Sequence, residues 1–191
     1  MEIKKDFILA SGSKDRFDLL KQIGFEPKAI YSSEIDETPR TGETPEVYVQ
    51  RMAFEKARAV SLIYPKQVIL AADTIVKVGE KILQKAYSEQ EQTDVMRLLS
   101  GITHQVLTAV CVADKEGSFY QDISVTEVTT ALLTEQDIQM YVESHDWEGC
   151  SGYKVEGLMG GFVEKINGSY TGLIGLPLYE TRLLLKRAGI L

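Results

Sequence analysis

The chain has 191 residues, of which 44% are hydrophobic and 26% are charged. This is the composition of an ordinary globular protein, and the length suffices for a single domain, whether as one core or as two intimately packed lobes on one sheet. The formal net charge is −7, so the surface as a whole repels polyanions and a nucleic-acid partner is not expected. Any phosphate site must therefore be a local cluster of Lys and Arg.

The cysteine content and the N-terminal residues predict a cytoplasmic protein. Cys111 and Cys150 are too few for a disulfide framework, and two reduced thiols are the simpler interpretation. The apolar run at residues 7–10 is too short for a signal peptide. No window approaches the roughly 20 apolar residues of a membrane helix, so we expect no membrane partner.

The hydrophobic pattern predicts strands and helices along the whole chain. Strands are expected at residues 7–10, 27–31, 67–78, 82–85, 103–113, 120–133 and 160–166. Helices are expected at residues 15–23, 45–63, 89–99, 134–144 and 176–188. Thr44 and Pro45 are typical of a helix start, and Thr134 with Asp137 forms a capping-box pattern. Because helices and hairpins both occur and no linker is visible, the sequence predicts one α/β unit with a mixed sheet.

Asp73 is the residue whose position most strongly indicates chemistry. It lies between the apolar runs 69–72 and 75–76, where burial of a carboxylate costs several kcal/mol unless the group is paired or binds a metal. Ends of strands are also the usual place for a site in α/β sheets. A strand-end acid that caps a turn is the alternative, and we favour a functional acid.

The turn Ser11-Gly12-Ser13 precedes a predicted helix whose first turn carries Lys14 and Arg16. Backbone N–H groups at a helix N-terminus, together with two cations, form a natural phosphate cradle. A plain helix cap at Ser13, with Asp15 at the positive end of the helix, explains the same residues equally well.

The segment at residues 149–157 suits a base pocket, because its glycines allow close approach, Tyr153 offers a stacking face and Glu156 offers acceptors. From the residues alone, an ordinary flexible connection is favoured. Lys56 lies on the same helical stripe as core residues. We interpret it as a lysine whose aliphatic chain packs beside the core while its ammonium group reaches solvent. We interpret Glu37 as a solvated loop acid. It would have a function only if folding brings it close to Asp73, so that both carboxylates bind Mg²⁺.

Taken together, these segments resemble the Maf family of nucleotide pyrophosphatases, historically called septum formation inhibitors, from Ile8 to Gly189. The resemblance is carried by Leu9-Ala10-Ser11-Gly12-Ser13, Arg16, Leu19-Leu20, Ile35-Asp36-Glu37-Thr38-Pro39, Glu55-Lys56-Ala57, Ala72-Asp73-Thr74, Leu98-Leu99-Ser100-Gly101-Ile102-Thr103-His104, Gly152-Tyr153, Glu156-Gly157 and Gly175-Leu176-Pro177-Leu178. It implies an elongated mixed sheet with flanking helices around a central cleft, similar to inosine-triphosphate pyrophosphatases. It also implies hydrolysis of a nucleoside triphosphate to monophosphate and pyrophosphate with Mg²⁺ or Mn²⁺, in a house-cleaning role linked to cell-division arrest.

The resemblance also implies a role for each site residue. Asp73 matches the catalytic base, and Glu37 matches an acid near the metal that Asp73 would share. The residues expected to contact the phosphates are Ser11, Ser13, Lys14, Arg16, Lys56 and Lys85. Lys56 and Lys85 are among the cations that would offset charge on the leaving pyrophosphate.

Three positions bear on specificity. Asp15 stands where the family usually has an Arg, so a forked grip on phosphate would be lost unless Lys14 compensates. Thr74 resembles members that act on dTTP and UTP, whereas Glu156 resembles members that act on 7-methyl-GTP. The chain is a hybrid, and both substrate classes stay open.

Two rival functions remain at this point. One is a non-catalytic nucleotide-binding regulator of septum formation, to which the missing Arg at position 15 gives weight. The other is a phosphatase that releases single phosphates. The sequence leaves open whether two copies form a homodimer.

Overall fold

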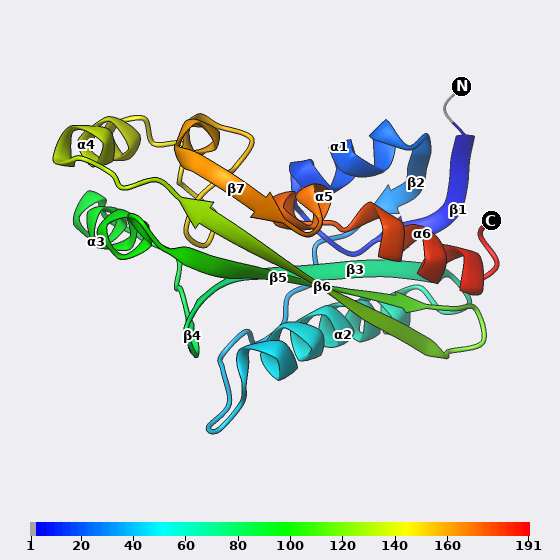
Figure 1. Ribbon diagram of the computed structural model, residues 1–191. Helices are drawn as coiled ribbons and strands as arrows, with labels where there is room; N and C mark the ends of the chain where they lie inside the picture. Colours follow the sequence, from blue (N-terminus) through cyan, green and yellow to red (C-terminus); the bar gives the residue numbers. More distant parts are fainter. Residues whose placement is uncertain (1–2) are drawn as a thin grey trace.

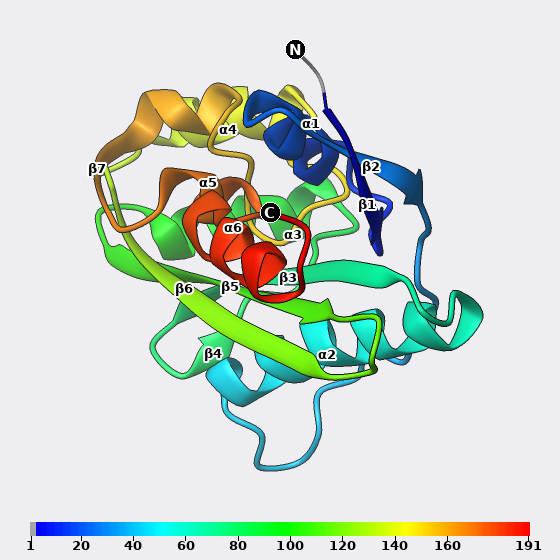
Figure 2. The same ribbon diagram turned by 90° about the vertical axis from the view of Figure 1, so that its right-hand side faces the viewer.

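One mixed sheet runs through the protein, and helices cover both of its faces (Figures 1 and 2). The computed structural model describes residues 3–191. The strands are β1 (Ile3–Leu9), β2 (Phe25–Ile30), β3 (Val68–Val78), β4 (Lys81–Ile82), β5 (Thr103–Ala113), β6 (Phe119–Thr130) and β7 (Val163–Asn167). The helices are α1 (Lys14–Gln22), α2 (Pro45–Ile63), α3 (Glu89–Leu99), α4 (Glu135–Glu143), η1 (Leu158–Phe162), α5 (Tyr170–Ile174) and α6 (Leu178–Arg187).

The strand order is β2-β1-β3-β5-β6-β7, with β4 paired to β3. β1 is parallel to β2 and to β3, and every other pair is antiparallel. The predicted mixed α/β sheet with flanking helices is therefore confirmed.

Helix starts follow the local sequence signals. Thr44 caps α2 by accepting a hydrogen bond from the Val47 amide, and Pro45 is the first helical residue. The capping box at α4 is complete, because Thr134 and Asp137 each accept from the other's backbone amide. Both signals were read correctly from the sequence.

Alternation along β3 divides the core between the two faces of the sheet. Ile69 and Ala71 pack with α2 on one face. Leu70 and Ala72 pack with α1 and α6 on the other. A third cluster fills the far end of the sheet, between α3, α4 and the segment that follows α4 (Figure 1). Because side chains alternate, neighbouring residues of β3 present their groups to opposite helices.

The strand order places a switch point at the end of β1. The chain leaves β1 through α1 to β2 on one side, and α2 then leads to β3 on the other side of β1. Pairing of β1 with β3 ends at Leu9 and Leu70, and β4 joins the same edge of β3 only at Lys77. Within the part of the chain that the structure describes, residues 71–75 of β3 have no strand on that edge. Ligand sites in open α/β sheets form at such switch points.

Several predicted boundaries were wrong. β1 begins at Ile3 instead of residue 7, β6 ends at Thr130 instead of residue 133, and β4 is only two residues long. Residues 160–162, predicted as strand, belong to the 3₁₀ helix η1, and the strand begins at Val163. Helix α5 was not predicted, because five residues are too few for a helical period to show.

Both cysteines are free, as expected, and Cys111 is buried. Within residues 3–191, no helix combines the length and the apolar character that crossing a bilayer requires.

We predict that Leu70→Ala lowers the free energy of unfolding by about 2–5 kcal/mol, because the Leu70 side chain is fully buried and its loss leaves a cavity. Leu62→Ala, in α2 with a side chain that is 75% exposed, is the matched control and should change stability by less than about 0.5 kcal/mol. Urea denaturation of both variants is the measurement. Equal losses would contradict the placement of β3 at the centre of the core.

Candidate active site

A pocket of about 690 Å³ opens at the switch point, where β3 lacks a neighbouring strand. All the residues that the sequence singled out as site residues line it, namely Ser11, Ser13, Lys14, Asp15, Arg16, Glu37, Lys56, Asp73, Thr74, Lys85 and Glu156. They come from the β1–α1 turn, the first turn of α1, the loop before α2, α2 itself, β3, the residues after β4, and the segment at 149–157. The fold thus brings together residues that lie far apart in the sequence.

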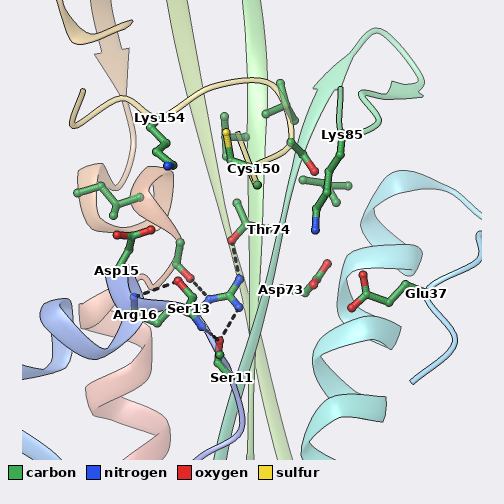
Figure 3. A pocket seen from close by; sticks show the side chains of 18 of the residues that line it. Ser11, Ser13, Asp15, Arg16, Glu37, Asp73, Thr74, Lys85, Cys150 and Lys154 are labelled. Atoms are coloured by element: carbon green, nitrogen blue, oxygen red, sulfur yellow. Dashed lines mark hydrogen bonds between the residues drawn. The ribbon is translucent and has the colours of Figure 1, made fainter. Parts of the chain in front are cut away.

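Asp73 and Thr74 are adjacent on β3 and turn to opposite sides. The Asp73 side chain is 12% exposed and accepts from Lys56 Nζ of α2 at 2.5 Å. Thr74 Oγ1 lies on the other side, 3.3 Å from a terminal guanidinium nitrogen of Arg16 (Figure 3). Asp73 is buried and paired, as its burial cost required.

The interpretation of Lys56 as a lysine that extends to solvent was wrong. Its side chain is 12% exposed, and Nζ also lies 2.8 Å from Glu37 Oε1. One ammonium therefore joins the acid of the loop before α2 to the acid of β3. The helical stripe alone could not show this, because the pairing depends on how α2 crosses β3.

Glu37 is held at this place through its backbone. Tyr48 donates from its hydroxyl to the carbonyl of Glu37 at 2.8 Å, and Arg51 donates to the carbonyl of Thr38 at 3.1 Å. Desolvation raises the pKa of Glu37, but the hydrogen bond from Lys56 and the charges of neighbouring cations outweigh it and lower the pKa overall. Glu37 is thus an ionised acid directed into the pocket rather than a free loop carboxylate.

Arg16 is the cation on the opposite wall. It donates from Nε to the carbonyl of Gly175 at 2.9 Å and from a terminal nitrogen to Ser11 Oγ at 3.1 Å. Among residues 3–191, no carboxylate lies within ion-pair distance of its guanidinium, and burial lowers its pKa. A fixed guanidinium without an anionic partner is a ready receptor for phosphate.

The turn at residues 11–13 caps α1 and also lines the pocket. Ser13 caps α1 by accepting from the Arg16 amide, and Ser11 Oγ accepts from the Ser13 amide at 3.1 Å. Lys14 lines the pocket, but its ammonium pairs with Asp18 at 2.5 Å, one turn along the helix. This pair is exposed and weak, so whether Lys14 replaces the Arg that Asp15 displaces stays a prediction.

The segment at residues 149–157 forms the wall opposite the α1 N-terminus, with Lys154 above Asp15 (Figure 3). Tyr153 is only 7% exposed and packs edge-on against His104, which differs from the open stacking face that we expected. Glu156 faces the pocket, and desolvation raises its pKa, aided by the negative charge of Asp15. Cys150 donates to the Trp147 carbonyl, and burial raises its pKa to about 11, so the thiol is poorly suited to act as a nucleophile.

Asp73 and Glu37 are the donors that a divalent cation could use. No group of three or more His, Cys, Asp or Glu suited to a metal occurs among the described residues. Mg²⁺ commonly takes one or two carboxylates and completes its shell with water and substrate phosphate oxygens. Two carboxylates beside a phosphate-sized cradle fit that ion when a nucleotide is bound.

A family model described as Maf-like protein matches residues 6–188. The chain belongs to this family. A protein from Rhodopseudomonas palustris (strain HaA2) is 47% identical over 189 residues, which is 95% of this chain and 91% of that protein. One from Hyphomonas neptunium is 45% identical over 183 residues and covers 95% of both chains. Both relatives are named dTTP/UTP pyrophosphatase.

Solved structures give a more distant likeness. A nucleoside-triphosphatase, or dITP/XTP pyrophosphatase, from Mycobacterium abscessus matches 69% of this chain and 76% of its own, with 15% identity and a TM-score of 0.41. The Staphylococcus aureus Ham1 protein matches 68% of this chain and 72% of its own, with 13% identity and a TM-score of 0.45.

Some site residues of this Maf protein were missed from its sequence. Neither Tyr48 nor Arg51 of α2 was singled out from the sequence. Thr108 of β5 donates to Thr74 Oγ1 at 3.0 Å or to the Gly172 carbonyl at 2.7 Å. A polar residue within the apolar run of β5 was the one available sign of this contact.

The ion pair that anchors the Glu37 loop predicts a pH dependence of stability. Arg51 forms a two-pronged pair with the buried Glu43, and this contact lowers the pKa of Glu43 to about 2 from an ordinary 4.5. A lowered pKa in the folded state gives stability that is present above 4.5 and lost as the pH falls toward 2. We expect the urea midpoint to drop through this range, and to drop less in Arg51→Met.

Arg97→Met is the control, because Arg97 pairs with Glu135 on the exposed surface. Its pH profile should match that of the parent protein. A parent-like profile in Arg51→Met would show that Glu43 does not gain its stability from this pair.

Proposed function

We propose that the protein hydrolyses a nucleoside triphosphate between the α- and β-phosphates, giving a monophosphate and pyrophosphate, with dTTP and UTP as its substrates. The observation that carries the proposal is the pairing of Asp73 and Glu37 on Lys56, across one pocket from the unpaired cation Arg16. The names of the relatives at 45–47% identity support the same activity.

The cradle at the start of α1 would hold the phosphates. Arg16 is already oriented by Ser11, Thr74 and Gly175, so little rotational freedom is lost when it binds an anion. Lys85 faces the same space from beyond β4 (Figure 3). These cations would neutralise the charge that develops on the departing pyrophosphate.

Asp73 would act as the base. Its carboxylate accepts a proton from a water molecule as the water oxygen bonds to the α-phosphorus and the bond from that phosphorus to the bridging oxygen breaks. The electron pair of the broken bond leaves on pyrophosphate. Lys56 fixes the orientation of the carboxylate through its 2.5 Å contact, which leaves the second carboxylate oxygen for the water.

Glu37 and Asp73 would hold Mg²⁺ or Mn²⁺ together with the phosphates. When bound, such an ion would polarise the phosphate oxygens and offset their charge. The residues of the chain contribute the placement, because the backbone of Glu37 is fixed by Tyr48 and its carboxylate is drawn to Lys56.

The base would be read by the wall at residues 149–157. The resemblance associates Thr74 with dTTP and UTP as substrates, and it associates Glu156 with 7-methyl-GTP. The relatives at 45–47% identity, both named dTTP/UTP pyrophosphatase, favour the first. A house-cleaning role and a link to cell-division arrest remain proposals that follow from this activity.

Asp73→Asn should lower kcat by roughly 10²–10⁴-fold, because the amide cannot take up the proton. The assay measures pyrophosphate released from a panel of nucleoside triphosphates with Mg²⁺ or Mn²⁺. Asp94→Asn, an exposed acid of α3, is the control and should keep the parent rate. Orthophosphate as the product would favour the phosphatase alternative, and binding without turnover would favour the regulator.

Glu156→Gln should raise the preference for dTTP and UTP over 7-methyl-GTP, because the amide donates and accepts at every pH while losing its attraction for a cationic ring. The ratio of kcat/KM between these substrates is the measurement. An unchanged ratio would place base recognition elsewhere in the pocket.

A further inference from the structure

The wall at residues 149–157 carries Glu156 yet contains almost no regular secondary structure. Its one backbone pairing to a strand-like segment is an isolated antiparallel bridge between Ser151 and Lys85. Such a segment could move freely unless buried groups hold it. Two polar side chains that the proposed chemistry does not use are buried against it.

The first is Gln92 of α3. Its side chain is 1% exposed, and its amide donates to the carbonyl of Gly152 at 2.8 Å. Burial of an amide is costly without a partner, so this hydrogen bond holds the two groups together. Gly152 has φ +83°, and a Cβ there would lie 3.1 Å from a methyl group of Val76, so its backbone also packs tightly on β3.

The second is His104 of β5. It is 2% exposed, and its Nε2 lies 2.6 Å from the Tyr153 hydroxyl, while the two rings pack edge to face. Burial lowers the pKa of His104 to about 4, so the ring is neutral near pH 7. His104 therefore serves as a neutral hydrogen-bond partner, and the Tyr153 hydroxyl is engaged away from the pocket space.

Neither Gln92 nor His104 lines the pocket, but both contact the segment that does. Their contacts fall on consecutive residues, Gly152 and Tyr153, three or four positions before Glu156. From this geometry we propose that Gln92 and His104 are positioning residues, which fix the wall at 149–157 and thereby set the selectivity for the base. The proposal rests on the proposed function in taking a nucleotide as the ligand and in assigning base recognition to the wall at 149–157.

The test measures binding rather than turnover. The probes are α,β-methylene analogues of dTTP and GTP, which cannot be cleaved, and inorganic tripolyphosphate, which has no base. Gln92→Leu should change the ratio of the two analogue Kd values by roughly tenfold, the effect of weakening about one hydrogen bond to the base. The Kd of tripolyphosphate should stay unchanged. Gln90→Leu, an exposed site on the same helix, is the matched control.

The His104 contact allows a test by rescue. His104→Phe should shift the ratio, whereas His104→Gln, whose amide can take the place of Nε2, should keep it near the parent value. Tyr153→Phe removes only the hydroxyl group that contacts His104. It is the variant to measure if Gln92→Leu does not fold. Thermal unfolding of every variant confirms that a folded protein is compared.

An unchanged analogue ratio in the folded variants would overturn the proposal, and so would a parallel loss of tripolyphosphate affinity. The proposed function fails separately, if the parent protein binds the analogues but releases no pyrophosphate from nucleotides. A parent protein that binds neither analogue would refute both proposals.

Discussion

The end of β1 is the constraint on which the site depends. With β2 on one side of β1 and β3 on the other, the two crossover helices lie on opposite faces of the sheet. Over residues 71–75, this edge of β3 is left without a strand within the described residues. That gap exposes Asp73 and Thr74 to the pocket while antiparallel pairing with β5 keeps their backbone rigid. The site is thus a consequence of strand order before any catalytic residue is considered.

Because side chains alternate along β3, the acids of the site and the cation Arg16 lie on opposite sides of this gap. Asp73 turns toward α2 and meets Lys56, whereas Thr74 turns toward α1 and meets Arg16. The acids therefore have a cation of their own on one wall, and the cation on the other wall stays available to an incoming anion. Exchange of these two neighbours on β3 would place the acid against Arg16 and fill the phosphate receptor with a protein carboxylate.

The sequence predicted those features that depend on local signals. The helix start at Thr44, the mixed sheet and the burial of Asp73 all follow from patterns within a few residues. Lys56 was misread because its partners lie on another strand and another loop, at a crossing that periodicity cannot describe. Residues 160–162 were misread as strand because a single 3₁₀ turn has no distinct pattern. The residues that the family resemblance named all line one pocket, but the tethers Tyr48, Arg51, Gln92 and His104 act through contacts that exist only in the folded chain.

These tethers explain how the loop residues of the site are held in place. Glu37 and the wall at 149–157 both lie outside helices and strands, yet each is fixed by polar groups that are themselves buried in the core. Buried polar groups stabilise one arrangement strongly, because any shift leaves a donor or acceptor without a partner. The loops carry side chains across the gap in the sheet, and hydrogen bonds to core residues fix the positions of these loops. On our proposal, base selectivity in this Maf protein depends on Gln92 of α3 and His104 of β5 as well as on the residues that line the pocket.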